Sequence, residues 1–99
     1  MSFNLFSSSN TIIGSQAGDG AWQNNACNYN TAVGQGAMRG TMDGAAHNVA
    51  VGFVSGTAIT QGQRNTFVGG GSGMNCTTGD KNVALGNDAN VAATVDEQI

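Results

Sequence analysis

Asn48-Val49-Ala50-Val51-Gly52 is one of five copies of the short pattern that decides how this chain folds. The other copies occupy residues 10–14, 30–34, 65–69 and 82–86, and a small residue stands three positions after each final glycine. Successive asparagines are 20, 18, 17 and 17 residues apart. A tandem repeat of this length indicates a stacked architecture, in which each copy packs against its neighbours.

The three residues between asparagine and glycine have the composition of a β-strand. Side chains alternate between the faces of a strand, so the first and third residues share one face and the middle residue lies on the other. The first and third residues are β-branched in almost every copy, as is typical of a packed strand interior. We therefore expect the third residues to lie inside the roll: Ile13, Val33, Val51, Val68 and Leu85.

The middle residues are also apolar, and three of the five are alanine. A strand that is apolar on both faces is covered on both faces. One face meets the rest of its own coil, so we expect the other face to meet a second chain, with alanine permitting a close approach. This argument predicts an oligomer whose subunit interface contains Ile12, Ala32, Ala50, Phe67 and Ala84.

The asparagines are the strongest polar feature of the repeat. Asparagine tolerates the left-handed conformation at a corner, and stacked amides form hydrogen-bonded ladders. We expect a structural ladder of Asn10, Asn30, Asn48, Asn65 and Asn82. The residue before each asparagine is variable and mostly polar, which predicts a solvent-exposed column of Ser9, Tyr29, His47, Arg64 and Lys81.

The remainder of each repeat is expected to form a turn, a second short strand and a return turn. The second strands are predicted at 26–29, 40–42, 57–60 and 74–77, and a further strand at 91–95. The fold class is therefore all-β: a left-handed parallel β-roll or β-solenoid of about five coils of 17–20 residues, intertwined or packed as a homotrimer. This domain spans residues 10–99, and residues 1–9 are expected to be an N-terminal cap or docking segment.

Composition excludes several classes of function. The net charge is −3 and only three residues are Lys or Arg, so the chain has no basic footprint for nucleic acid or an anionic membrane. No apolar run reaches the length of a transmembrane helix, so membrane insertion is not expected. The first residues lack the basic region and long apolar stretch of a signal peptide.

The sequence predicts no catalytic, cofactor-binding or metal-binding site. His47 is the only histidine and lacks convergent partners in its repeat. Gly69–Gly73 resembles a phosphate loop but lacks its lysine and its following helix, so we interpret it as a tight corner. Gly18-Asp19-Gly20 lacks the full calcium-binding nonapeptide series. We therefore expect no enzymatic activity.

The sequence also contains two cysteines and, in its expanded first repeat, two large aromatic residues. Cys27 and Cys76 belong to different layers of the stack, two to three layers apart at about 4.8 Å per layer, which is too far for a disulfide between them. We expect both to be small buried or interface thiols, with an intermolecular bridge as the alternative. Trp22 and Tyr29 lie in the expanded first repeat and form a possible contact patch, with a buried cap at the solenoid end as the other interpretation.

The unit Asn-Thr-Ala-Val-Gly-x-x-Ala, seen best at residues 30–37, resembles two families of repeats. One is the head domain of trimeric autotransporter adhesins, and the other is the repeat of phage tail fibres. Both families imply parallel β-rolls that trimerise about a fibre axis and serve in surface attachment. By this resemblance Val49 and Val51 face the roll interior and Ala50 the trimer interface.

The resulting functional hypothesis is a structural, non-catalytic segment of a phage or cell-surface attachment fibre. Its expected partners are two further copies of itself, neighbouring fibre proteins and a host-surface receptor, and its expected location is the virion or the cell surface. The alternative is a solenoid that binds a repetitive surface such as glycan or ice. That alternative requires a regular, exposed threonine ladder, and Val49 and Val83 interrupt the series Thr11, Thr31 and Thr66.

Overall fold

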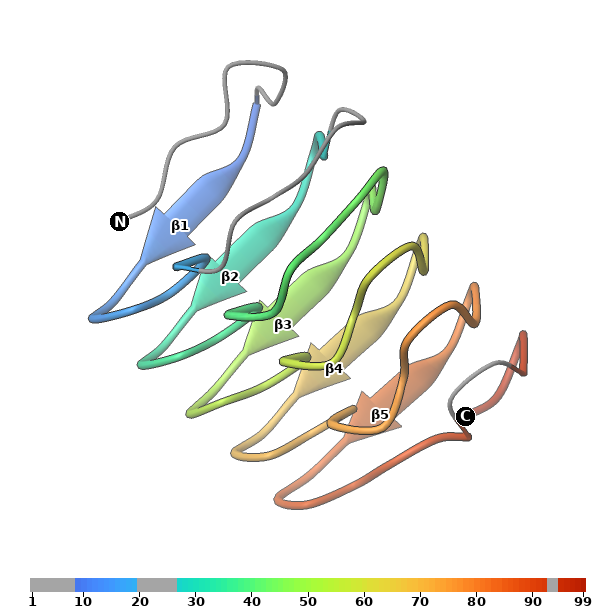
Figure 1. Cartoon of the computed structure of the whole chain (residues 1–99). Coiled ribbons are helices and arrows are strands. Elements are labelled where there is room, and N and C mark those ends of the chain that lie inside the picture. Colours follow the sequence, from blue (N-terminus) through green and yellow to red (C-terminus); the bar gives the residue numbers. More distant parts are fainter. Residues whose placement is uncertain (1–8, 20–26, 93–94) are drawn as a thin grey trace.

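The computed structural model describes residues 9–19, 27–92 and 95–99 (Figure 1). The described residues form an all-β fold in which parallel strands build a β-solenoid of about four turns. The strands are β1 (Thr11–Ile13), β2 (Thr31–Val33), β3 (Val49–Val51), β4 (Thr66–Val68) and β5 (Val83–Leu85). They form one sheet in the order β1-β2-β3-β4-β5, so each strand pairs with the strand of the next repeat.

The repeats stack in strict register. Ala32 pairs with Ala50, and Ala50 pairs with Phe67, so equivalent positions of the pattern lie directly above one another. The backbone bonds follow the same rule: the N–H of Gly52 donates to the carbonyl of Val33 at 2.7 Å, and the N–H of Val49 donates to the carbonyl of Asn65 at 2.8 Å. The predicted parallel stacking of these strands is confirmed.

The middle residue of each strand points into the solenoid. Ala32, Ala50 and Phe67 have no exposed surface, and Ala84 is 5% exposed. The prediction that the middle residues, Ile12, Ala32, Ala50, Phe67 and Ala84, form a subunit interface is therefore wrong. The interior is narrow and already holds a second column of small side chains, among them Ala37, Ser55 and Ser72. Alanine suits this narrow interior, which is the physical reason for the small residues.

The first and third residues of the strands face outward. Ile13, Val68 and Leu85 are 59%, 40% and 64% exposed, and Val33 and Val51 are half-buried. The prediction that Ile13, Val33, Val51, Val68 and Leu85 line the roll interior is therefore wrong, because the alternation is correct but the two faces are exchanged.

Phe67 is the one large exception in the inward column, and glycines make room for it. An ideal Cβ placed on Gly73 would land on the ring carbons of Phe67, and one placed on Gly56 would lie 3.5 Å from its Cδ2. Gly73 also has φ of +68°, a conformation that favours glycine. The glycine-rich stretch 69–73 is thus a tight corner, as expected, and its last glycine leaves room for Phe67.

The return segments contain no strands within the described ranges. Residues 27–29, 40–42, 57–60 and 74–77 form turns and irregular backbone, so the predicted second strands are wrong there. Residues 91, 92 and 95 are likewise not in a strand, and positions 26, 93 and 94 lie outside the described residues. Cross-repeat bonds in these segments are isolated, such as the N–H of Asp43 to the carbonyl of Thr60 at 2.7 Å. Met42, Ile59 and Cys76 nevertheless bury their side chains in the core.

Candidate functional site

The asparagine ladder joins the repeats along one buried corner. The Oδ1 of Asn48 accepts the backbone N–H of Asn65 at 3.0 Å, and the Oδ1 of Asn65 accepts that of Asn82 at 2.9 Å. The Nδ2 of each asparagine closes its own repeat: Asn48 donates to the carbonyl of Gly62 and Asn65 to that of Gly79, both at 2.9 Å. Asn10 and Asn30 make the equivalent bonds, so the predicted hydrogen-bonded ladder is present.

The physical reason why asparagine occupies the ladder positions differs in one respect from the prediction. The left-handed residue at the corner is the one before each asparagine, with φ of 58° to 60° at Ser9, Tyr29, His47, Arg64, Lys81 and Glu97. The asparagines themselves do not have positive φ. Asparagine is therefore used for its amide, which offers a donor and an acceptor within one short side chain.

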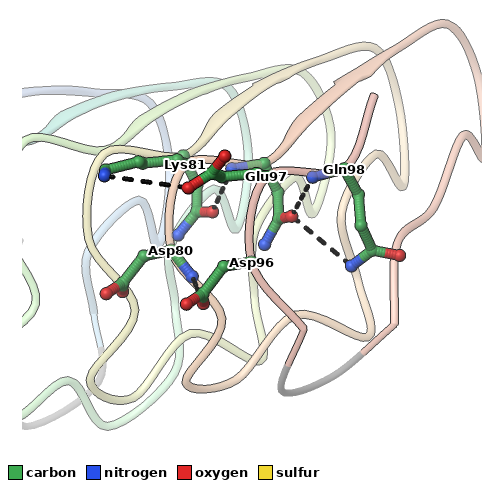
Figure 2. A network of polar contacts seen from close by, with 7 residues as sticks. Asp80, Lys81, Asp96, Glu97 and Gln98 are labelled. Carbon is green, nitrogen blue, oxygen red and sulfur yellow. Dashed lines mark hydrogen bonds and ion pairs between the residues drawn. The ribbon is translucent and has the colours of Figure 1, made fainter.

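The residues before the asparagines form an exposed column, as predicted. Tyr29 is 58% exposed, and its ring stacks on His47 with centroids 4.9 Å apart and an interplanar angle of 19°. Lys81 and Glu97 approach to 3.9 Å, with both side chains more than half exposed (Figure 2). An exposed pair of this kind contributes little stability. Trp22, the other member of the expected contact patch, lies outside the described residues.

The outward face of the sheet carries ordered rows of apolar side chains on the described surface. Its two parallel columns follow the strands from β1 to β5. One column contains Ile13, Val33, Val51, Val68 and Leu85, and the other contains Thr11, Thr31, Val49, Thr66 and Val83. The threonines therefore lie on the outward face, together with the third strand residues that the sequence predicted to be inside the roll.

The two thiols are both buried and are not bridged to one another, which agrees with the expectation of buried thiols. Burial raises the pKa of the Cys76 thiol, while hydrogen bonds with the side chain of Asn82 and the backbone of Gly79 act in the opposite direction. A thiol held in its protonated form is a poor nucleophile. Cys76 therefore has the character of a core residue.

Across the part of the chain that the structure describes, no group of three or more His, Cys, Asp and Glu side chains is placed to hold a metal ion. Nowhere in residues 9–19, 27–92 and 95–99 does a helix occur that is long and apolar enough to cross a membrane.

Gln98 also takes part in the asparagine ladder, although the repeat pattern did not predict this role. Its backbone N–H donates to the Oδ1 of Asn82 at 2.7 Å, in the place that an asparagine backbone occupies in the other repeats (Figure 2). Two features of the sequence could have predicted this role: Gln98 lies 16 residues after Asn82, which is close to the repeat length, and it carries an amide side chain.

No family model, curated protein sequence or solved structure matches this chain.

Proposed function

We propose that this chain is a structural, non-catalytic segment of an attachment fibre, assembled as a homotrimer through the outward face of its sheet. The observation that carries the proposal is the open apolar column of Ile13, Val33, Val51, Val68 and Leu85, in which three members are at least 40% exposed. A regular apolar face of this kind marks an interaction surface. The resemblance of the repeat to phage tail fibres and adhesin heads favours a trimer as the occupant.

A trimer about a long axis requires a straight face that presents the same chemistry in each layer. The strands supply it, because equivalent residues pair in register from β1 to β5. Three such faces in contact bury the apolar columns, which contributes about 25 cal/mol for each Å² removed from water. A fibre of this type extends from a virion or a cell surface, joins neighbouring fibre proteins and presents a receptor-binding tip.

The test is the absolute mass in solution, measured by light scattering on a sizing column over a dilution series. The wild-type chain is expected at three times its own 9.9 kDa, and Val51→Arg at the monomer mass with an unchanged circular dichroism spectrum. Gln61→Arg adds the same charge at an exposed position away from the strands and serves as the control. A wild-type monomer at every concentration, or a Val51→Arg trimer, would refute the proposal.

A second candidate is the solenoid that binds a repetitive surface, either glycan or ice. The observation that favours it is the outward position of Thr11, Thr31 and Thr66 in one column with Val49 and Val83. It requires this face to remain uncovered, so a monomer is its precondition. Inhibition of ice growth or retention on a glycan matrix, lost in Thr31→Lys, tests it directly.

A further inference from the structure

The outward face of the sheet lies between two left-handed corners of each repeat. The corner before the asparagine has φ of 58° or 59° at Ser9, Tyr29, His47, Arg64 and Lys81. The corner after the glycine has φ between 50° and 70° at Gln16, Gly36, Val54, Gly71 and Asp88. We call these two columns the asparagine-side edge and the glycine-side edge. The strand of every repeat lies between them, so they border any contact that the outward face makes.

The two edges carry opposite charges beside β4 and β5. Arg64 and Lys81 are exposed on the asparagine-side edge, just before these two strands. Asp88 is exposed on the glycine-side edge, after β5. Between the edges, the outward strand residues are all Thr, Val, Ile or Leu. The apolar face therefore separates a basic border from an acidic one.

The carboxylate of Asp88 lies between the levels of β4 and β5. An ideal Cβ on Gly71, the equivalent residue of the preceding repeat, would meet the Oδ1 of Asp88. Its Oδ2 accepts the Nδ2 of Asn87 at 3.3 Å, and Asp88 forms no ion pair with the residues that the structure describes. Asp88 thus holds an exposed negative charge at the same height as Arg64 and Lys81 on the opposite edge.

The two basic side chains have no strong partner in the described part of their own chain. The Nζ of Lys81 lies 3.9 Å from the Oε1 of Glu97, and both side chains are exposed (Figure 2). An exposed pair of this length contributes little stability. Arg64 bonds through its backbone N–H, to the carbonyl of Ala46, and forms no ion pair with a described residue. Both cations can therefore turn to a carboxylate of another chain at little cost.

The edges also match at the level of β2. Tyr29 presents an exposed aromatic ring on the asparagine-side edge. On the glycine-side edge, the Nη1 of Arg39 donates to the Oε1 of Gln16 at 3.2 Å, and an ideal Cβ on Gly36 would lie 3.9 Å from this nitrogen. A guanidinium is attracted to the face of an aromatic ring. An aromatic ring and a cation therefore stand on opposite edges at one level.

We infer that the two edges meet between neighbouring chains of the trimer, where Arg64 and Lys81 of one chain bind the Asp88 carboxylate of the next. This inference rests on the proposed function and names the contacts that align its chains. In a closed ring of three, the asparagine-side edge of each chain meets the glycine-side edge of the next, because a cyclic interface is heterologous. Rotation about an axis parallel to the stack moves no chain along that axis, so equivalent repeats meet at one level. The occupant is a second copy, because this chain supplies both charges.

A disulfide between the edges tests the contact. Lys81→Cys/Asp88→Cys places one thiol on each edge at the level of β5. Within one chain β5 alone separates the two positions by about 10 Å, which is beyond the roughly 7 Å Cα limit of a disulfide. The native thiols are buried, so a new bridge forms between chains. Oxidation with glutathione disulfide is expected to give covalent dimers and trimers on a non-reducing gel, and a light-scattering trimer without these bands would overturn the inference.

Tyr29→Cys/Asp88→Cys is the matched control for the alignment of the chains. It uses the same two edges, but its positions lie three levels apart, about 14 Å at 4.8 Å per level. This pair is expected to remain unbridged. Bridges in this pair in place of the first pair would show a staggered assembly and would contradict the level alignment.

Two charge variants separate the ion pairs from the effect of net charge. Asp88→Asn removes the carboxylate but keeps its size, and asparagine tolerates the φ of 60° at this position. Glu97→Gln removes the same unit of charge, but only from the weak partner of Lys81. Asp88→Asn is expected to lower the trimer association constant roughly tenfold, because three equivalent exposed contacts are lost. Glu97→Gln is expected to raise this constant or leave it unchanged, and an equal fall in both variants would contradict the pairing.

These measurements separate the edge contacts from the trimer itself. Wild-type chains that remain monomeric refute the trimer and the edge contacts with it. A wild-type trimer that Val51→Arg dissociates, but that forms no bridge in Lys81→Cys/Asp88→Cys and is unaffected by Asp88→Asn, supports the trimer and rejects only the edge contacts. Bridges in the level pair together with a weakened Asp88→Asn trimer support both.

Discussion

Replacing Asn65 by alanine tests how much of the stability depends on the asparagine ladder. The Nδ2 of Asn65 donates to the carbonyl of Gly79 at 2.9 Å and to the Oδ1 of Asn48 at 3.0 Å, and its own Oδ1 accepts the N–H of Asn82 at 2.9 Å. Asn65 has no exposed surface. Water therefore cannot replace these bonds when the side chain is removed.

The loss follows from the two backbone groups that remain buried. The N–H of Asn82 loses its acceptor and the carbonyl of Gly79 loses its amide donor. Each unsatisfied buried group costs roughly 1–3 kcal/mol, so we expect Asn65→Ala to lower the free energy of unfolding by about 2–6 kcal/mol. For a domain of this size the loss corresponds to a fall in Tm of about 4–8 °C for each kcal/mol.

Asn10→Ala is the matched control, because Asn10 makes the same kinds of bond at the end of the ladder but is only half-buried. Urea unfolding followed by circular dichroism measures both variants. We expect a loss of about 1 kcal/mol for Asn10→Ala, because Asn10 itself is only half-buried and water can enter the site once its side chain is removed. If Asn65→Ala lowers the free energy of unfolding no more than Asn10→Ala does, the ladder sets the register of the repeats without adding net stability. That result would refute the reasoning.

Three further predictions follow from individual positions. Gly73→Ala is expected to lower the free energy of unfolding in urea by about 2–4 kcal/mol, because the Cβ of the alanine meets the Phe67 ring and the φ at this position is +68°. An equal loss in the wild-type and Phe67→Ala backgrounds would contradict this cause. Val54→Gly is expected to raise the free energy of unfolding by roughly 0.5–1 kcal/mol, because Val54 has φ of 50° where Gly36 and Gly71 stand in neighbouring repeats; a loss of more than about 1 kcal/mol would show that its packing outweighs the strain. Burial raises the pKa of the Cys76 thiol above 9.0, so the folded state favours the protonated thiol; this stabilisation is fully present below pH 9.0 and is lost as the pH rises through the folded pKa. Between pH 7 and pH 10 the free energy of unfolding should therefore fall more for the wild type than for Cys76→Ala. Equal falls in the two proteins would contradict this prediction.

The local sequence pattern was sufficient to predict the positions of the strands and the asparagine ladder. All five strands lie where the sequence predicts them, because β-branched residues between an asparagine and a glycine recur in register and parallel stacking is the only arrangement that pairs every copy with the next. The hydrogen-bonding role of the asparagines was also predictable, since a buried amide repeated in each layer needs a partner in the adjacent layer.

The second strands were overpredicted for a physical reason. Met42, Ile59 and Cys76 bury their side chains, and this apolar signal resembles that of a strand. Burial in these segments is achieved by turns that direct single side chains inward, with only isolated backbone bonds between repeats. Residue pattern alone does not distinguish a strand from a turn that buries one side chain.

The sequence by itself determined which residues share a face, and only the tertiary structure decided which face is inside. Alternation groups Val49 with Val51 and sets Ala50 against them, whichever way the chain turns after Gly52. The turn brings Ser55 and Gly56 beneath Ala50, where a Cβ added to Gly56 would lie only 3.1 Å from the Cβ of Ala50, so little space is left for a larger side chain there. The small residues are therefore enclosed and the β-branched residues are left on the surface, where a second chain can cover them.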